Sequence, residues 1–147
     1  WPATALELVP IGAAKTVRRG RDVTVVTYGR KDGVDKRACD TLAEEGTDVE
    51  LIDLRSLHPY DWPAIAQSVG RTGRAVFVNE DTEITNFGEH LIRRIVEELF
   101  YELHAPPKLL AGEHLPGIGL ADSLEMASVP QKDGIKRAIV ELAQHEP

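Results

Sequence analysis

The fold is decided by the stretch Val49-Glu-Leu-Ile-Asp-Leu-Arg-Ser-Leu-His-Pro-Tyr-Asp61, in which a short apolar run gives way to a polar ending. The run Val49–Ile52 has the composition of a buried strand. Asp61 can accept hydrogen bonds from the first free amides of a helix, and Pro63 is tolerated in a first turn because its missing N–H has no partner there. The stretch therefore predicts a strand, a polar loop and the start of a helix.

The same alternation of strand and helix continues on both sides. Val23–Tyr28 is rich in β-branched residues and predicts a strand, and apolar residues at helical spacing predict a helix from about Val34 to Glu45. The further predicted elements are a strand at Ala75–Val78, a helix opened by a capping box of Asn86 and Glu89, a strand at Lys108–Ala111 and a helix at Gly134–Gln144. Repeated units of this kind predict an α/β protein, a three-layer α/β/α sandwich around a mostly parallel sheet of about five strands.

The helix behind Asn86 carries the clearest apolar stripe of the chain. Its members are Phe87, Leu91, Ile92, Ile95, Val96, Leu99, Phe100 and Leu103. Burying such side chains contributes roughly 1.5–3 kcal/mol each, so we expect the whole stripe to lie in the core.

The ends of the chain set the expected domain boundaries. The first 20 residues are poor in pattern and hold Pro2, Pro10 and Gly12, so we interpret 1–20 as a linker and lead-in arm and 21–147 as one domain. The first residue is Trp1 rather than Met, and we expect the chain to begin inside a longer polypeptide.

Composition and charge narrow the classes of function. Apolar residues make up 42% and charged residues 28% of the chain, and no segment approaches the roughly 20 apolar residues of a membrane helix. The net charge is −7, with thirteen acidic against six basic residues in 79–147. This balance disfavours nucleic acid as a partner, and it suits either a basic protein partner or a solvated acidic surface. The single cysteine, Cys39, is expected to be buried in a reducing compartment.

Familiar motifs of catalysis are missing from the sequence. Gly117-Ile-Gly119 begins like a dinucleotide fingerprint but lacks the third glycine and does not directly follow a strand, so we interpret it as a loop. We find no phosphate loop, no nucleophile elbow and no paired-cysteine or histidine pattern that would bind a metal. We therefore predict no catalytic, cofactor-binding or metal-binding residue in this chain.

Polar residues gather where the predicted strands end. In open α/β sheets, ligands and partners meet the carboxyl ends of the strands, which places Tyr28-Gly29-Arg30, Asp53 to Asp61 and Asn79-Glu80-Asp81 along one rim. The candidate substrate-channel or interface residues are Arg55, His58, Tyr60, Glu80 and Asp81. A structural role is open as well: Asp53 and Arg55 could pair with each other or with loop backbone, and Asp61 could be only a helix cap.

The order of these motifs resembles the C-terminal domain of the beta chain of thiamine-diphosphate-dependent 2-oxo acid dehydrogenases, which has the transketolase C-terminal fold. The resemblance covers about residues 9–145. It is carried by Val9-Pro-Ile-Gly12, Val23-Thr-Val-Val-Thr-Tyr-Gly29, the opening stretch, Ser68-Val-Gly-Arg-Thr-Gly-Arg74, Val76-Phe-Val-Asn-Glu80 and Ala105-Pro106.

The resemblance implies a division of labour. In such enzymes thiamine diphosphate and magnesium are held by other domains, and the C-terminal domain helps to dimerise the subunits and lines the approach to the active site. It also offers a surface to the subunit-binding domain of the acyltransferase core. Arg55 matches an arginine that contacts substrate phosphate in sugar-phosphate-using relatives, a role that transfers here only as lining of a channel. The isolated chain is expected to be inactive.

The resemblance also implies a location and a set of partners. The location is the cytoplasm in a bacterium or archaeon and the mitochondrial matrix in a eukaryote. The partners are other domains or subunits of the same dehydrogenase, with no nucleic acid and no membrane. Two alternatives are a freestanding flavodoxin-like regulatory or binding module, for which Tyr28-Gly29-Arg30 lacks the acidic cluster of a receiver, and a nucleotide-using enzyme, disfavoured by the missing phosphate loop.

Overall fold

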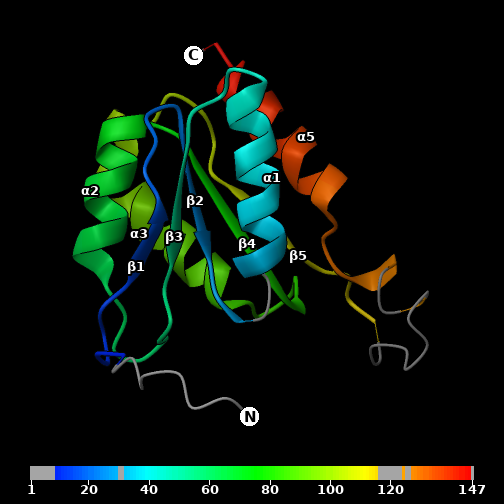
Figure 1. Cartoon of the computed structure of the whole chain (residues 1–147). Helices are drawn as coiled ribbons and strands as arrows, with labels where there is room; N and C mark the ends of the chain where they lie inside the picture. The colour runs from blue at the N-terminus through cyan, green and yellow to red at the C-terminus, as the bar shows by residue number, and fades with distance from the viewer. Residues whose placement is uncertain (1–8, 30–31, 116–123, 125–126, 147) are drawn as a thin grey trace.

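A five-stranded sheet forms the centre of the protein, with strand order β1-β3-β2-β4-β5 (Figure 1). The computed structural model describes residues 9–29, 32–115, 124 and 127–146, and of residues 32–35 only the backbone. The strands are β1 (Lys15–Arg18), β2 (Val23–Thr27), β3 (Val49–Asp53), β4 (Ala75–Thr82) and β5 (Lys108–Gly112). β1 is antiparallel to β3 and the other neighbouring pairs are parallel, which confirms the predicted mostly parallel sheet.

Helices cover both faces of the sheet and complete three layers (Figure 1). They are α1 (Asp32–Glu44), α2 (Trp62–Thr72), α3 (Phe87–Leu99) and α5 (Lys132–Ala143), with a 3₁₀ turn η2 (Phe100–Glu102) directly after α3. α1 and α5 pack on one face, and α2 and α3 pack on the other. The predicted three-layer α/β/α architecture is confirmed.

The helix starts follow the predicted capping chemistry. Asp61 Oδ1 accepts a hydrogen bond from the Ala64 amide at 3.2 Å, at the start of α2. Asn86 and Glu89 form the reciprocal capping box of α3. Both caps fix where a helix leaves the rim of the sheet, and so they position the loops that carry the candidate residues.

The apolar stripe of α3 is wider than the face that the helix buries. Leu91 and Ile95 are fully buried, but Val96 is 40% exposed and Phe100 is 60% exposed. Val96 lies about 100° around the helix from Ile95, and Phe100 belongs to the 3₁₀ turn, whose tighter winding directs its side chain away from the sheet. The prediction that the whole stripe is core is therefore wrong for these two residues.

A strand lies within the first 20 residues of the chain. Residues expected to form a patternless lead-in contain the edge strand β1, which is only four residues long and mostly half-exposed, so it carries little apolar signal.

Cys39 is buried, as predicted. The predicted loop at Gly117-Ile-Gly119 lies outside the described residues. Among the helices that the structure describes, none is long and apolar enough to cross a membrane.

Candidate functional site at the carboxyl ends of the strands

The predicted rim exists, because β2, β3 and β4 point their carboxyl ends the same way (Figure 1). Thr27 at the end of β2 is level with Asp53 of β3 and with Val78 of β4. The loops after β2 and β3 therefore leave the sheet at the same end, and the last residues of β4, 79–82, extend beyond the ends of β2 and β3 there. Arg30, predicted to join this rim, lies outside the described residues.

Arg55 is turned back onto its own chain. Its backbone is left-handed, with φ of 56°, and its N–H donates to Asp53 Oδ1 at 3.0 Å. Guanidinium Nη2 donates to the Ala13 carbonyl at 3.0 Å, whereas the buried Nε has no acceptor among the described residues. A left-handed arginine costs roughly 1–2 kcal/mol, so these hydrogen bonds offset a strained backbone. Through Nη2 the guanidinium holds the residues that lead into the domain.

Two more side chains of the same loop hold this lead-in segment, which we define as residues 9–14. The Gly12 amide donates to Ser56 Oγ at 2.9 Å. The Ala14 amide donates to Asp61 Oδ2 at 3.0 Å, while Oδ1 of the same carboxylate caps α2. Asp61 thus caps α2, which was one of the roles considered for it, and it also holds the lead-in segment at Ala14. The polar ending of the opening stretch receives the polypeptide that enters the domain.

Tyr60 connects the rim to α3. Its ring lies edge-on to Phe87, with ring centroids 5.3 Å apart. Its hydroxyl lies 2.8 Å from His90 Nε2 and accepts a hydrogen bond from Arg94 Nη1 at 2.9 Å. A guanidinium can only donate, so the phenol oxygen accepts from Arg94, and the hydroxyl hydrogen of Tyr60 remains available for His90 Nε2.

Arg94 also joins α2 to α3. Its guanidinium stacks over Trp62 with 4.2 Å to the ring centroid, and its Nε donates to Glu98 Oε1 at 2.6 Å. Trp62 Nε1 donates to the other oxygen of Glu98 at 2.8 Å. The hydrogen bonds to Glu98 and Tyr60 raise the pKa of Arg94, and the hydrogen bond from Arg94 lowers the pKa of Glu98. This arrangement fixes the position of the Tyr60 hydroxyl.

A buried amide pair underlies the end of β4. Asn79 and Asn86 exchange side-chain hydrogen bonds of 3.0 and 2.8 Å, and the Tyr28 hydroxyl donates to Asn86 Oδ1 at 3.1 Å. Burial raises the pKa of Tyr28 to about 12, with a further contribution from the negative charge of Asp81. The Tyr28 ring also packs edge-on to Phe87, with centroids 5.9 Å apart, so Phe87 links this network to Tyr60.

The remaining predicted residues keep their side chains open. Glu80 is half-buried and no hydrogen bond of its carboxylate is found among the described residues. Asp81 is exposed, and among the described residues its carboxylate accepts only from the neighbouring Thr82 amide, at 2.8 Å. His58 is exposed and has no hydrogen bond among the described residues. Gly29, with φ of 82°, brings the β2 loop to this point: a Cβ there would lie 3.5 Å from Glu80 Oε1. The rim is therefore negative beside β4.

Sequence reasoning missed the partners of Tyr60. His90, Arg94 and Glu98 follow one another at spacings of four residues, which places them on one face of a helix. That spacing is the signal in the sequence, and it belongs to the polar face of α3 rather than to its apolar stripe. Within the described part of the chain, no group of three or more His, Cys, Asp or Glu side chains is placed to hold a metal ion.

Comparison with known proteins identifies relatives over most of the chain. Residues 12–135 match the family described as "Transketolase, C-terminal domain". The chain is 40% identical over 130 residues to pyruvate dehydrogenase E1 component subunit beta-2, mitochondrial, of Oryza sativa subsp. japonica, covering 88% of this chain and 34% of the relative. It is 33% identical over 137 residues to 2-oxoisovalerate dehydrogenase subunit beta of Bacillus subtilis, covering 93% of this chain and 42% of the relative. It is 46% identical over 109 residues to 3-methyl-2-oxobutanoate dehydrogenase subunit beta of Mycobacterium tuberculosis, covering 73% of this chain and 31% of the relative.

A solved structure supports the fold. A split-gene transketolase, described as an inactive beta4 tetramer, superposes with a TM-score of 0.81 at 21% identity, over 95% of this chain and 45% of that one. The chain spans about a third to two fifths of the length of the curated relatives it matches.

Proposed function

The chain belongs to the transketolase C-terminal domain family, and from this premise we propose that it is the C-terminal domain of the beta subunit of a 2-oxo acid dehydrogenase. The parent enzyme would decarboxylate a 2-oxo acid oxidatively with thiamine diphosphate and transfer the acyl group to a lipoyl group. In that enzyme this domain would serve assembly and line the entrance to the active site. The names of relatives at 33–46% identity support this assignment.

The observation that carries the proposal is the tethering of the lead-in segment. Backbone groups of Gly12, Ala13 and Ala14 are held by Ser56, Arg55 and Asp61. The polypeptide therefore enters along the rim, on the side of β1 and β3. This placement supports a rim that faces the rest of the enzyme.

The rim residues do not fit thiamine diphosphate. The cofactor binds through magnesium and a diphosphate, but the described residues include no metal-binding group. The open side chains Glu80 and Asp81 would repel the diphosphate, and Nη2 of Arg55 already donates to the Ala13 carbonyl. We therefore assign the cofactor to other domains of the parent enzyme and derive no chemical step in this chain.

The proposed partners follow from the same assignment. They are further domains or subunits of the dehydrogenase, and the subunit-binding domain of the acyltransferase core. The excess of acidic residues in 79–147 supports a basic partner surface. Binding of the isolated subunit-binding domain should then weaken as salt screens the charges. The cellular location would follow the parent enzyme, the cytoplasm in a bacterium or archaeon and the mitochondrial matrix in a eukaryote.

A domain exchange tests the proposal. The segment of the Bacillus subtilis 2-oxoisovalerate dehydrogenase subunit beta that this chain matches is replaced by this chain, and the hybrid is assembled with its partner subunits. We expect assembly and oxidation of 2-oxoisovalerate. The matching segment of the Mycobacterium tuberculosis relative serves as control. A hybrid that folds but neither assembles nor turns over, while the control hybrid does both, would contradict the proposal.

The isolated chain gives a second test. Purified protein is supplied with thiamine diphosphate, Mg²⁺ and pyruvate or 3-methyl-2-oxobutanoate, and release of carbon dioxide is followed. We expect none above the protein-free rate. Decarboxylation by this chain alone would show that the chemistry resides here.

A further inference from the structure

The outer edge of β5 is an unpaired strand edge. β5 stands last in the sheet, and it pairs with β4 through Val76 with Lys108, Phe77 with Leu109 and Val78 with Leu110. Among the described residues no strand pairs with its other side. Alternate backbone N–H and C=O groups of such a strand point outward and are ready to accept another strand.

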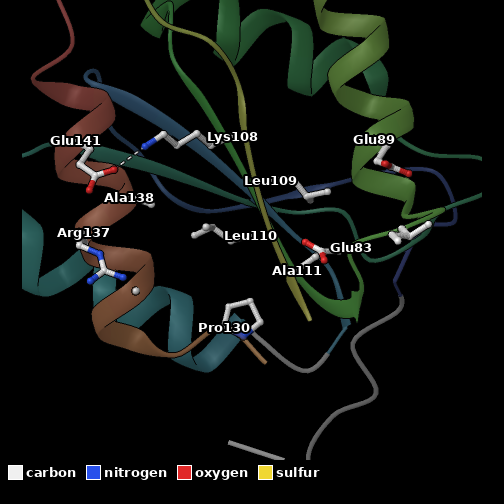
Figure 2. A pocket seen from close by; sticks show the side chains of 12 residues that line it. Glu83, Glu89, Lys108, Leu109, Leu110, Ala111, Pro130, Arg137, Ala138 and Glu141 are labelled. Atoms are coloured by element: carbon white, nitrogen blue, oxygen red, sulfur yellow. Dashed lines mark hydrogen bonds and ion pairs between the residues drawn. The ribbon is translucent and has the colours of Figure 1, made fainter. Parts of the chain in front are cut away.

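This edge lies in a groove between α3 and α5 (Figure 2). The groove has a volume of about 730 Å³, and all of Lys108 to Ala111 contribute to it. The two leucines of the edge belong to opposite layers: Leu109 packs with the α2 and α3 core, and Leu110 packs with the α1 and α5 core. Both are only half-buried, so apolar surface remains on each side of the strand edge.

The usual protection of an edge strand is weak here. A lysine on an edge strand opposes pairing with another chain, because its charge must stay in water. Lys108 is instead drawn to α5 by an ion pair with Glu141 at 2.7 Å (Figure 2). Its ammonium group therefore lies over α5, and the lysine charge does not shield the backbone edge from Leu109 onward.

Apart from the Lys108–Glu141 ion pair, whose two charges cancel, the two walls of the groove carry opposite charge. Glu83 and Glu89 line the side of α3, and Arg137 lines the side of α5 (Figure 2). Arg137 is exposed and acts electrostatically on Glu141 of the same helix, but it forms no ion pair within 4.0 Å among the described residues. Glu83 likewise forms none among them. Glu89 accepts the Asn86 amide in the capping box but keeps its negative charge. An occupant is expected to present a cation to one wall and an anion to the other.

We propose that β5 accepts an extended peptide segment of a partner protein as a further strand, with a basic residue facing Glu83 and Glu89 and an adjacent acidic residue facing Arg137. Neighbouring residues of a strand point to opposite faces, so a basic and acidic pair next to each other in sequence meets both walls. Flanking apolar residues cover Leu109 and Leu110. The backbone pairs with β5 and the side chains give specificity, as in strand addition generally. This inference does not depend on the proposed function, because it uses only the groove.

The test uses the purified chain and the synthetic peptide acetyl-Thr-Val-Lys-Glu-Val-Ile-Thr-amide. Binding is measured by NMR chemical shifts and by hydrogen exchange of the amides of residues 108–112. We expect saturable shifts at β5 and slowed exchange there. A peptide with the same side chains but N-methylated at alternate amides should bind at least about tenfold more weakly, because it cannot complete the ladder.

Charge reversal gives a matched pair of variants. Arg137→Glu makes both walls negative, so it should weaken the peptide about fivefold and should remove the preference of the unmodified chain for this peptide over one in which Lys and Glu are exchanged. Arg37→Glu makes the same charge change on α1, outside the groove, and should alter neither affinity. The proposal is overturned if no peptide binds at β5, or if binding ignores both N-methylation and charge order. It is also overturned if the β5 amides of the free chain are already protected, by a segment of this chain or by a second copy.

Discussion

The rim has two halves that look alike in sequence and differ in structure. The first we call the loop half (residues 54–61). Its side chains Arg55, Ser56 and Asp61 form hydrogen bonds with the backbone of the lead-in segment. The second, the acidic half (residues 79–81), leaves Glu80 and Asp81 open to solvent or to a partner. Polar residues at the end of a strand are therefore not sufficient evidence of a binding surface. Three polar side chains of the loop half bond the backbone of the lead-in segment, whereas Glu80 and Asp81 make no bond to that segment among the described residues.

The largest effect is expected beneath the acidic half. Asn86→Ala removes the cap of α3, leaves Asn79 Nδ2 without its acceptor and takes one hydrogen bond from the Tyr28 hydroxyl. The cap contributes about 1 kcal/mol and the unpaired buried group about 1–3 kcal/mol, so urea unfolding should show a loss of about 2–4 kcal/mol. Gln67→Ala, an amide truncation at an exposed position of α2, should change the free energy of unfolding by less than about 0.5 kcal/mol. Equal losses in both variants would remove the argument for a buried network.

A smaller effect separates the two halves directly. Asp61→Ala loses both the α2 cap and the tether of Ala14, and should cost about 1–2 kcal/mol. It should also speed proteolytic cleavage within the lead-in segment. Asp81→Ala, the matched change in the acidic half, should cost less than about 0.5 kcal/mol. If Asp81→Ala lowers the free energy of unfolding as much as Asp61→Ala does, the acidic half also bonds to its own chain, and the contrast between the halves is wrong.

The pH dependence of Tyr28 tests the burial of the network. Its pKa is raised to about 12 in the folded protein from an ordinary value near 10. The folded state then holds this proton more tightly than the unfolded state. The resulting stabilisation is complete below about pH 10 and is lost as the pH rises from about 10 to 12. Tyrosinate absorbance should show a late-titrating component that disappears in Tyr28→Phe. Loss of all phenolic protons near pH 10 would contradict a buried hydroxyl.

The smallest effect is expected for the open side chains themselves. Glu80→Gln and His58→Ala each remove a group with no hydrogen bond among the described residues, and each should shift the free energy of unfolding by less than about 0.5 kcal/mol. Thermal unfolding at neutral pH is a sufficient measurement. A loss of more than about 1 kcal/mol in the free energy of unfolding for either variant would show that the side chain forms a stabilising contact.

The sequence was sufficient to predict the layers and the rim. β-branched runs at Val23–Thr27 and Ala75–Val78, alternating with helical periods, specify a parallel sheet because parallel neighbours need crossover helices. Asp61 and Asn86 were recognised as caps because capping depends on local spacing. These are short-range relationships within a few residues of the chain.

Long-range relationships were beyond the sequence. The bonds from Gly12 to Ser56 and from Ala14 to Asp61 join residues more than 40 positions apart, and a small residue such as Gly12 gives no sign of its backbone partner. Likewise, the stripe of α3 gives the apolar face but not the width of sheet available to cover it, so Val96 was wrongly placed in the core. β1 was missed because an exposed edge strand of four residues has almost no apolar pattern.

The central claim is that the rim is a surface for assembly, and hydrogen exchange tests it most directly. The amides of Tyr28, Gly29 and residues 79–81 are compared between the isolated chain and the assembled hybrid with the Bacillus subtilis subunit. The account predicts that they become strongly protected on assembly, while amides of α1 on its exposed face keep their rates. Rim amides that exchange equally fast in the assembled enzyme would contradict it.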